Sequence, residues 1–177
     1  MNLKEFVRES NRIERIYREH TLEELKAHEE FLAHDSILIE DLVRFAGVVQ
    51  PDAKLRNRRG LNVYVGNHIP VPGGKEVETQ LSAILYGVNS GETDPYTAHC
   101  DYEHLHPFTD GNGRSGRVLW LWMMKRDDRY ERALVIGFLH NFYYQALAAH
   151  HQRQIWNRRD LSNCFCIYGA WDVGGRE

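Results

Sequence analysis

One helix-length segment constrains the fold of this chain more than any other feature of its 177 residues. Residues 114–125 have the composition of a helix, and the apolar run Val118–Met124 inside this segment covers every side of it. A helix without a polar face is buried all round, so it belongs at the centre of a bundle. The run is seven residues long, and a membrane span needs about twenty. We therefore expect a buried central helix in a soluble protein that does not contact a membrane.

Helical signals dominate most of the remaining chain. A T-x-x-E capping box begins a helix at Thr21 that should run to about residue 34, and Pro95 can begin another that ends before Pro107. Apolar residues recur at helical spacing in four further segments, which are residues 10–19, 37–49, 75–88 and 130–151.

Residues 60–73 break this pattern. A short β-favouring run at 62–65 is followed by a Gly66-Asn67 turn and by an extended stretch with Pro70 and Pro72. Since proline cannot donate to a sheet ladder, the segment should form a small hairpin at an edge, which we call the flap (residues 60–73). The expected fold class is all-α: a single helical bundle with a small β-hairpin flap.

Charge and cysteine content exclude several classes of protein. The 22 Lys and Arg against 25 Asp and Glu give a net charge of −3, which does not favour nucleic-acid binding. Three cysteines are too few for a disulfide scaffold, and the N-terminus has no signal peptide. We expect a cytoplasmic protein, with secretion by dedicated machinery left open. The histidines around Cys100 lack zinc-ligand spacing, so a zinc site is not expected.

The segment that carries chemistry is HPFTDGNGRSGR at residues 106–117. Its glycines sit between two helical segments, so backbone N–H groups and a helix N-terminus can cradle an anion there. Arg114 and Arg117 lie three residues apart and can fork onto phosphate oxygens. Asp110 is a carboxylate of the kind Mg²⁺ prefers beside phosphate, and His106 can take a proton near neutral pH. The segment therefore indicates a site for phosphoryl or nucleotidyl transfer. The competing interpretation is a structural turn whose charged side chains are solvated.

These residues match the signature of the Fic family, H-P-F-x-[D/E]-G-N-G-R-x-x-R, at every defined position. The resemblance extends over about residues 10–150 and implies an all-helical core with a flap. Fic proteins typically transfer AMP from ATP to a hydroxyl of a target protein. The resemblance therefore implies a Mg²⁺-dependent protein adenylyltransferase, with ATP as substrate and a protein that presents a Ser, Thr or Tyr hydroxyl as partner. A homo-oligomer or self-modification remains open.

The resemblance also implies a role for each residue of the motif. His106 would be the general base, Asp110 would hold Mg²⁺, and Phe108 would anchor the loop in the core. The phosphates would be bound by Gly111, Asn112, Gly113, Arg114 and Arg117, with the last of these on the γ-phosphate. The flap would hold the target's backbone by strand-like pairing, through Val63, Tyr64, Val65 and Gly66.

Two alternatives stay open. One is a different reaction on the same scaffold, either deAMPylation or transfer of another phosphate-containing group. The other is a non-catalytic module that binds a nucleotide, as in a toxin–antitoxin pair. The basic cluster before the flap is expected to be solvated, and contact with ATP or an acidic target is the less favoured reading. It consists of Lys54, Arg56, Arg58 and Arg59.

An inhibitory segment, which we call the brake, is also expected near the N-terminus. Residues 10–15 resemble the inhibitory S/T-x-x-x-E-G/N motif of many Fic proteins, with Ser10 and Glu14 in place. Glu14 would pair with Arg117 and exclude the γ-phosphate. Arg15 departs from the motif, and an intrahelical pair of Glu14 with Arg18 is the competing explanation.

The expected organisation has three parts. An inhibitory helix region covers residues 1–20 and the Fic domain core covers residues 21–152. A tail at residues 153–177 is rich in aromatic side chains and should pack on the domain.

Overall fold

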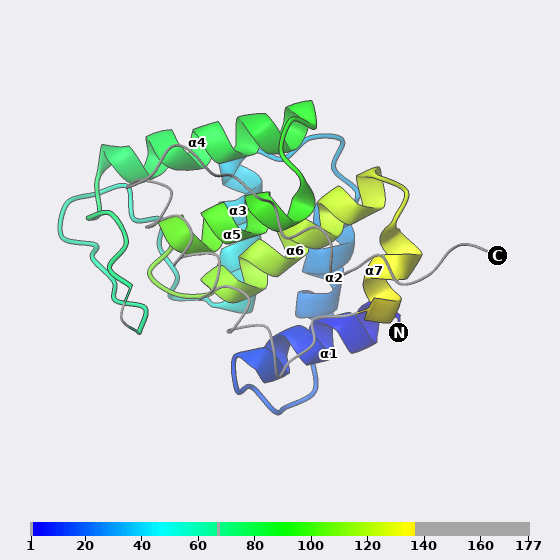
Figure 1. The fold of residues 1–177 in the computed structure, drawn as a ribbon. Helices are drawn as coiled ribbons and strands as arrows, with labels where there is room; N and C mark the ends of the chain where they lie inside the picture. The colour runs from blue at the N-terminus through cyan, green and yellow to red at the C-terminus, as the bar shows by residue number, and fades with distance from the viewer. Residues whose placement is uncertain (1, 67, 137–177) are drawn as a thin grey trace. The chain divides into compact units, whose positions relative to one another are not determined.

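The structure is a computed structural model that describes residues 2–66 and 68–136. This part of the chain contains seven helices (Figure 1), and the prediction of an all-α fold is confirmed. Their bounds are α1 Leu3–Ile13, α2 Leu22–Leu32, α3 Ile39–Val49, α4 Lys75–Ser90, α5 Pro95–Leu105, α6 Asn112–Arg126 and α7 Tyr130–Ile136. The predicted continuation of the last helix to residue 151 and the aromatic tail at 153–177 lie outside the described residues.

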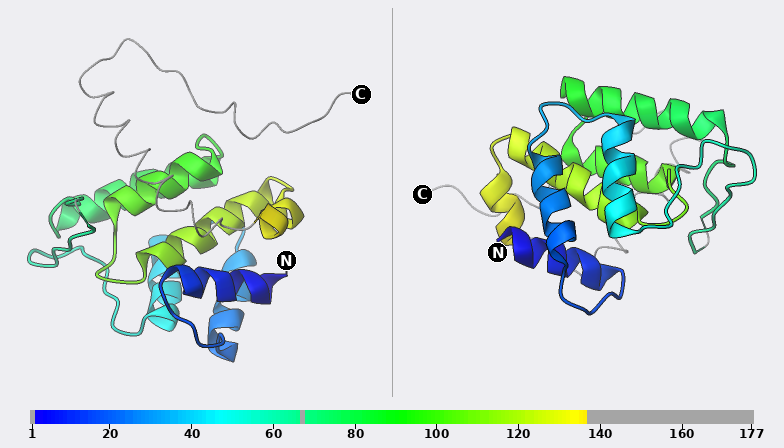
Figure 2. Two further views of the ribbon diagram at one scale, coloured as in Figure 1. Left: turned by 60° about the horizontal axis from the view of Figure 1, so that its bottom comes forward. Right: turned by 180° about the vertical axis from the view of Figure 1, so that it is seen from behind.

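Helix α6 is the centre of the bundle, as its apolar run predicts. It packs against α1, α2, α3, α5 and α7, while α4 packs on α5 and α3 (Figure 2). Val118, Leu121 and Met123 have no exposed surface. Within the described residues, no helix combines the length and the apolar character that a bilayer crossing requires.

The capping residues explain where the helices begin and end. Thr21 and Glu24 form the predicted capping box at the start of α2. Asp94 accepts hydrogen bonds from the first turn of α5, which begins at Pro95 as expected.

The predicted bounds of the first helix, residues 10–19, are wrong, because only residues 10–13 of that range are helical. Helix α1 begins at Leu3, because Asn2 and Glu5 form a capping box that the sequence analysis missed. It ends at Ile13, with Glu14 as its C-cap, and Arg15 then adopts a left-handed conformation with φ 60°. Glu14 therefore sits at the end of a helix, where its side chain can face another element.

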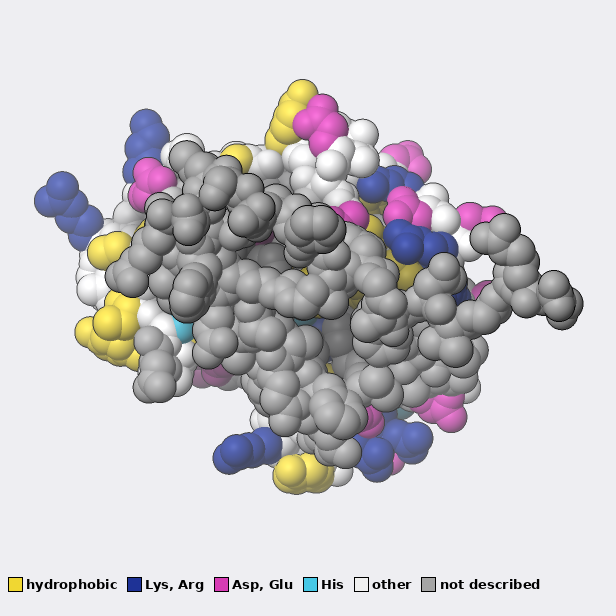
Figure 3. Space-filling view, in the orientation of Figure 1, with side chains coloured by type: hydrophobic (Ala, Val, Ile, Leu, Met, Phe, Trp, Pro, Cys, Tyr) yellow, Lys and Arg dark blue, Asp and Glu magenta, His cyan; other side chains and the backbone are white. Residues whose placement is uncertain are grey.

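The flap is less regular than the predicted hairpin. Its tip has one antiparallel bridge. The Val65 N–H donates to the His68 carbonyl at 3.0 Å, and the His68 N–H donates to the Val65 carbonyl at 2.9 Å. Gly66 supplies the left-handed turn with φ 57°. Apolar side chains lie exposed over this end of the molecule (Figure 3), and Tyr64 and Ile69 are 77% and 71% exposed.

The chain that enters the flap pairs with the loop between α5 and α6. Leu55 forms an antiparallel bridge with Phe108. On either side of this bridge, the Arg56 N–H donates to the Pro107 carbonyl at 2.8 Å and the Thr109 N–H donates to the Lys54 carbonyl at 2.9 Å. The base of the flap is thus hydrogen-bonded to the segment that carries the motif.

Candidate active site

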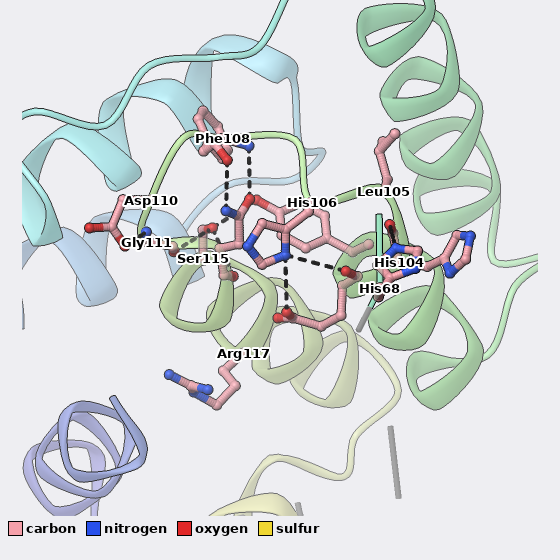
Figure 4. Close-up of polar contacts among 12 residues, drawn as sticks. His68, His104, Leu105, His106, Phe108, Asp110, Gly111, Ser115 and Arg117 are labelled. Carbon is pink, nitrogen blue, oxygen red and sulfur yellow. Dashed lines mark hydrogen bonds and ion pairs between the residues drawn. The ribbon is translucent and has the colours of Figure 1, made fainter. Parts of the chain in front are cut away.

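The loop between α5 and α6 is shaped by the side chain of Asn112, the first residue of α6. Asn112 Oδ1 accepts from the Phe108 N–H at 2.8 Å, and Asn112 Nδ2 donates to the Phe108 carbonyl at 2.8 Å (Figure 4). Phe108 is 1% exposed and belongs to the hydrophobic core. The loop is therefore closed on itself by Asn112 and fixed to the bundle by the Phe108 ring.

His106 lies at the C-terminal end of α5 in a left-handed conformation, with φ 51°. Pro107 follows it, and the residue before a proline avoids the helical region. His106 Nδ1 lies 3.4 Å from the Glu103 carbonyl oxygen and 4.0 Å from Glu103 Oε2 (Figure 4). Since a carbonyl oxygen only accepts, this contact favours the tautomer with the proton on Nδ1, which leaves Nε2 as an acceptor.

The environment of His106 keeps its ring neutral. Burial, with smaller contributions from Arg56 and His68, lowers the pKa of His106 to about 4. The Glu103 carbonyl and the Glu14 carboxylate oppose this shift. At neutral pH the imidazole is therefore unprotonated and able to accept a proton.

The start of α6 has the features of an anion site. Gly111 is its N-cap, with φ 76°, and the first N–H groups of a helix have no partner within the helix. Asp110 Oδ1 accepts from the Gly111 N–H at 2.6 Å, which holds this exposed carboxylate beside the helix start.

The donor set beside α6 suits a cation held jointly with phosphate. Among residues 2–66 and 68–136, no group of three or more His, Cys, Asp or Glu side chains could hold a metal alone. Mg²⁺ commonly takes one or two carboxylates and several phosphate oxygens. The Asp110 carboxylate therefore fits Mg²⁺ that arrives with a nucleotide.

Arg117 is completely buried and joins α6 to the end of α1. Its Nε donates to Ser10 Oγ at 2.8 Å, and its Nη2 donates to the Ser10 carbonyl at 3.0 Å. The same Nη2 lies 2.6 Å from Glu14 Oε1. Arg18 instead forms its ion pair with Glu24, at 2.7 Å, so the competing Glu14–Arg18 pair is not what the structure shows.

The Glu14 carboxylate also lies against the first turn of α6. A Cβ atom added to Gly113 would come within 2.1 Å of Glu14 Oε1 and 2.9 Å of Arg117 Nη1. Gly113 is therefore needed for this close approach. A carboxylate at a helix N-terminus is favoured by the dipole, so Glu14 stands where the sequence predicts a bound anion.

Arg114 faces a different partner. Its guanidinium donates to the Val49 carbonyl, at the end of α3, and to Gln50 Oε1 at 2.7 Å. Burial lowers the pKa of Arg114. In this structure Arg114 caps α3, and its contact with a phosphate stays a prediction.

The basic cluster contains the residue that the sequence analysis missed. Lys54, Arg58 and Arg59 are exposed, but Arg56 has no exposed surface, so the expectation of a solvated side chain was wrong for Arg56. No periodicity in an irregular loop distinguishes one of four basic residues. The neighbouring Leu55 pairs with Phe108 in the structure, a contact that spacing along the chain does not reveal.

The flap is attached to α5 through two histidines. His68 Nε2 lies 2.8 Å from the His104 carbonyl oxygen, and the two rings lie 4.3 Å apart (Figure 4). Val63 and Val65 are half-buried while Tyr64 is exposed, so neighbouring flap side chains face alternate sides.

Comparison with known proteins gives one family match. The family model described as "Fic/DOC family" matches residues 20–124, which include the motif and the flap but not Ser10 and Glu14. No solved structure matches the chain significantly.

Several curated relatives share the name protein adenylyltransferase Fic. The protein from Culex quinquefasciatus is 36% identical over 104 residues, which is 52% of this chain and 20% of the relative. The protein from Drosophila mojavensis is 36% identical over 90 residues, which cover 47% of this chain and 18% of the relative. The protein from Drosophila yakuba is 32% identical over 122 residues, which cover 63% of this chain and 24% of the relative. The matched region thus spans about a fifth of the length of these relatives.

Proposed function

The chain belongs to the Fic/DOC family, and from this premise we propose that it is a protein adenylyltransferase. It transfers AMP from ATP to a Ser, Thr or Tyr hydroxyl of a target protein. The observation that carries the proposal is the single loop that joins the neutral His106 ring to the N-terminus of α6. The relatives named protein adenylyltransferase Fic support the same reaction.

The proposed reaction is a displacement at the α-phosphorus of ATP. The target hydroxyl oxygen forms a bond to the α-phosphorus while the bond to the pyrophosphate oxygen breaks. His106 Nε2 accepts the hydroxyl proton, for which its low pKa and the Nδ1 contact with Glu103 leave it available. Because the ring stays unprotonated over the neutral range, this base is ready without a prior deprotonation.

The start of α6 would bind the triphosphate. Gly111 and Gly113 let backbone N–H groups approach the phosphate oxygens, and Asn112 keeps the loop in shape through Phe108. Mg²⁺, held by Asp110, would neutralise charge on the phosphates. Preorganised donors of this kind supply much of the rate in phosphate transfer.

The flap would present the target. Its alternating side chains at Val63, Tyr64 and Val65, with Gly66 at the turn, suit pairing with an extended peptide backbone. Such pairing would bring a target hydroxyl to the loop, because the base of the flap is bonded to the same loop.

Glu14 would act as a brake on this reaction. Arg117 would receive the γ-phosphate, but here it is bound to Glu14 and Ser10. A γ-phosphate and the Glu14 carboxylate are both anions, so they compete for one guanidinium. The segment at residues 1–20 would then be an inhibitory region.

DeAMPylation is a second candidate, and one contact favours it. The Glu14 carboxylate lies over Gly113, so it could orient a water molecule toward an AMP group at the α6 N-terminus. Under that alternative, Glu14→Gly would abolish AMP removal instead of releasing AMP transfer.

The test uses the Glu14→Gly chain with ATP, Mg²⁺ and a cell lysate, and reads modified proteins by mass spectrometry. We expect AMP-sized additions on hydroxyl side chains that exceed those made by the unmodified chain. The matched control is the double variant Glu14→Gly with His106→Ala, which should fold and make none. Additions that survive the loss of His106 would remove this residue from the mechanism.

A further inference from the structure

Arg56 places a fully buried guanidinium among backbone carbonyl oxygens. Its Nε donates to the His106 carbonyl at 2.6 Å, and its Nη2 donates to the Leu105 carbonyl at 2.8 Å. Its Nη1 donates to the Val71 carbonyl at 2.9 Å and to the Leu61 carbonyl at 3.4 Å. One planar side chain therefore holds four carbonyls from two separate parts of the chain.

These two parts are the end of α5 and the base of the flap. Leu105 and His106 close α5, where the negative end of the helix dipole favours a cation. Leu61 and Val71 lie at the two sides of the flap base. The Arg56 backbone adds two neighbouring contacts: its N–H donates to the Pro107 carbonyl in the loop after α5, and its carbonyl accepts from the N–H of Gly74, the N-cap of α4, both at 2.8 Å.

Burying this charge is costly for the fold. Loss of hydration lowers the pKa of Arg56, and within the described residues its guanidinium bonds to backbone carbonyls rather than to a carboxylate. An arginine still stays charged, since its guanidinium ordinarily titrates far above neutral pH. Apolar side chains at this position would leave the four carbonyls without a donor, so the guanidinium is the group that holds the end of α5 and the flap base together.

We propose that Arg56 is a positioning residue for AMP transfer, which fixes the backbone of His106 and the flap in one arrangement. A target hydroxyl held by the flap then arrives at the His106 ring in reacting geometry. The inference rests on the proposed function, and Arg56 itself need not touch ATP or the target.

The first test compares Arg56→Lys with its parent, in the Glu14→Gly background. Lysine keeps the charge and reaches some of the carbonyls, but it lacks the planar fork that meets both elements. We expect kcat to fall about 10-fold to 100-fold, since small misplacements of reacting groups are costly. The KM for ATP should stay within about twofold, because the α6 N-terminus is unchanged.

Arg126→Gln in the same background is the matched control. Arg126 also donates to the carbonyls at the end of a helix, those of Val88 and Asn89 in α4, and it packs over the Trp122 ring. It lies at the end of α6 away from the motif. Its replacement should lower the thermal unfolding temperature and leave kcat unchanged. Equal losses of kcat in the two variants, in proportion to lost stability, would overturn the proposal.

A second readout follows the His106 ring by NMR and does not need catalysis. The charged or titratable groups that face this ring are Arg56, His68, Glu103 and Glu14. Arg56→Gln removes a positive charge, so the pKa of His106 should rise, and the ring signals should broaden or shift as its backbone anchor is lost. Arg126→Gln should change neither property.

The outcomes separate the two proposals. A Glu14→Gly parent without AMP transfer contradicts the proposed function, while the NMR comparison still decides whether Arg56 positions His106. An active parent whose kcat is unaffected by Arg56→Lys refutes the positioning role. If Arg56→Gln fails to fold, Arg56→Lys supplies both the kinetics and the ring signals.

Discussion

If Glu14 inhibits AMP transfer as proposed, the backbone at Arg15 should set how strong this inhibition is. Arg15 follows the C-cap of α1 and has φ 60°, a conformation that costs an L-residue with a side chain about 1–2 kcal/mol. Glycine avoids this cost, but fixing its more flexible backbone in this conformation costs about 0.5–1 kcal/mol of conformational entropy. Arg15→Gly should therefore stabilise the Glu14–Arg117 contact by about 0.5–1 kcal/mol net, provided that Arg15 relaxes when Glu14 leaves.

This stabilisation lowers the fraction of molecules in which Arg117 is released from Glu14. Since about 1.36 kcal/mol corresponds to a tenfold change, the basal rate of AMP transfer should fall about twofold to fivefold in Arg15→Gly. The assay is incorporation of labelled AMP at saturating ATP, with the thermal unfolding temperature measured alongside. Arg15→Ala is the control, because it removes the same charge and keeps the Cβ atom. An equal fall in both variants, or an unchanged rate in Arg15→Gly, would refute the backbone argument.

Two further predictions concern the fold. Asn112→Ala should cost about 2–4 kcal/mol of unfolding free energy in urea titrations and abolish transfer, because two buried groups of Phe108 lose their partners. Asn89→Ala removes the same pair of bonds from Ile37, away from the loop, so it should leave transfer intact; transfer that survives Asn112→Ala would contradict the role given to the loop. Burial lowers the pKa of His28 to about 4 and that of His99 to about 3, so in acid the unfolded chain takes up protons that the folded chain does not. The unfolding free energy should fall by roughly 1.4 kcal/mol per histidine and pH unit below about 6.5, until pH about 4, and equal stability at pH 7.5 and pH 5 would contradict this.

Local signals predicted much of the fold. The limits of α5 follow from Pro95 and from Pro107, and the burial of α6 follows from its lack of a polar face. The start of α1 was missed because the Asn2–Glu5 capping box precedes the apolar stripe on which the prediction rested. The flap contains less strand than expected, since only its tip and its base form bridges.

The candidate site was predictable where the chemistry lies in adjacent residues. Residues 106–117 form the loop and the first turns of α6 from one continuous segment. Glu14 forms an ion pair with Arg117, as the resemblance implies. Contacts made across the fold could not be read from spacing. Arg114 donates to a carbonyl at the end of α3, and Arg56 donates to carbonyls at the end of α5, because tertiary packing brings those groups together.

The origin of the transferred group tests the central claim most directly. The Glu14→Gly chain would be incubated in parallel with ATP labelled at the α-phosphate and ATP labelled at the γ-phosphate, and the label in protein would be counted. Transfer of AMP predicts that protein gains the α label and no γ label, and that His106→Ala removes it. Gain of the γ label, or of neither label, would contradict the account.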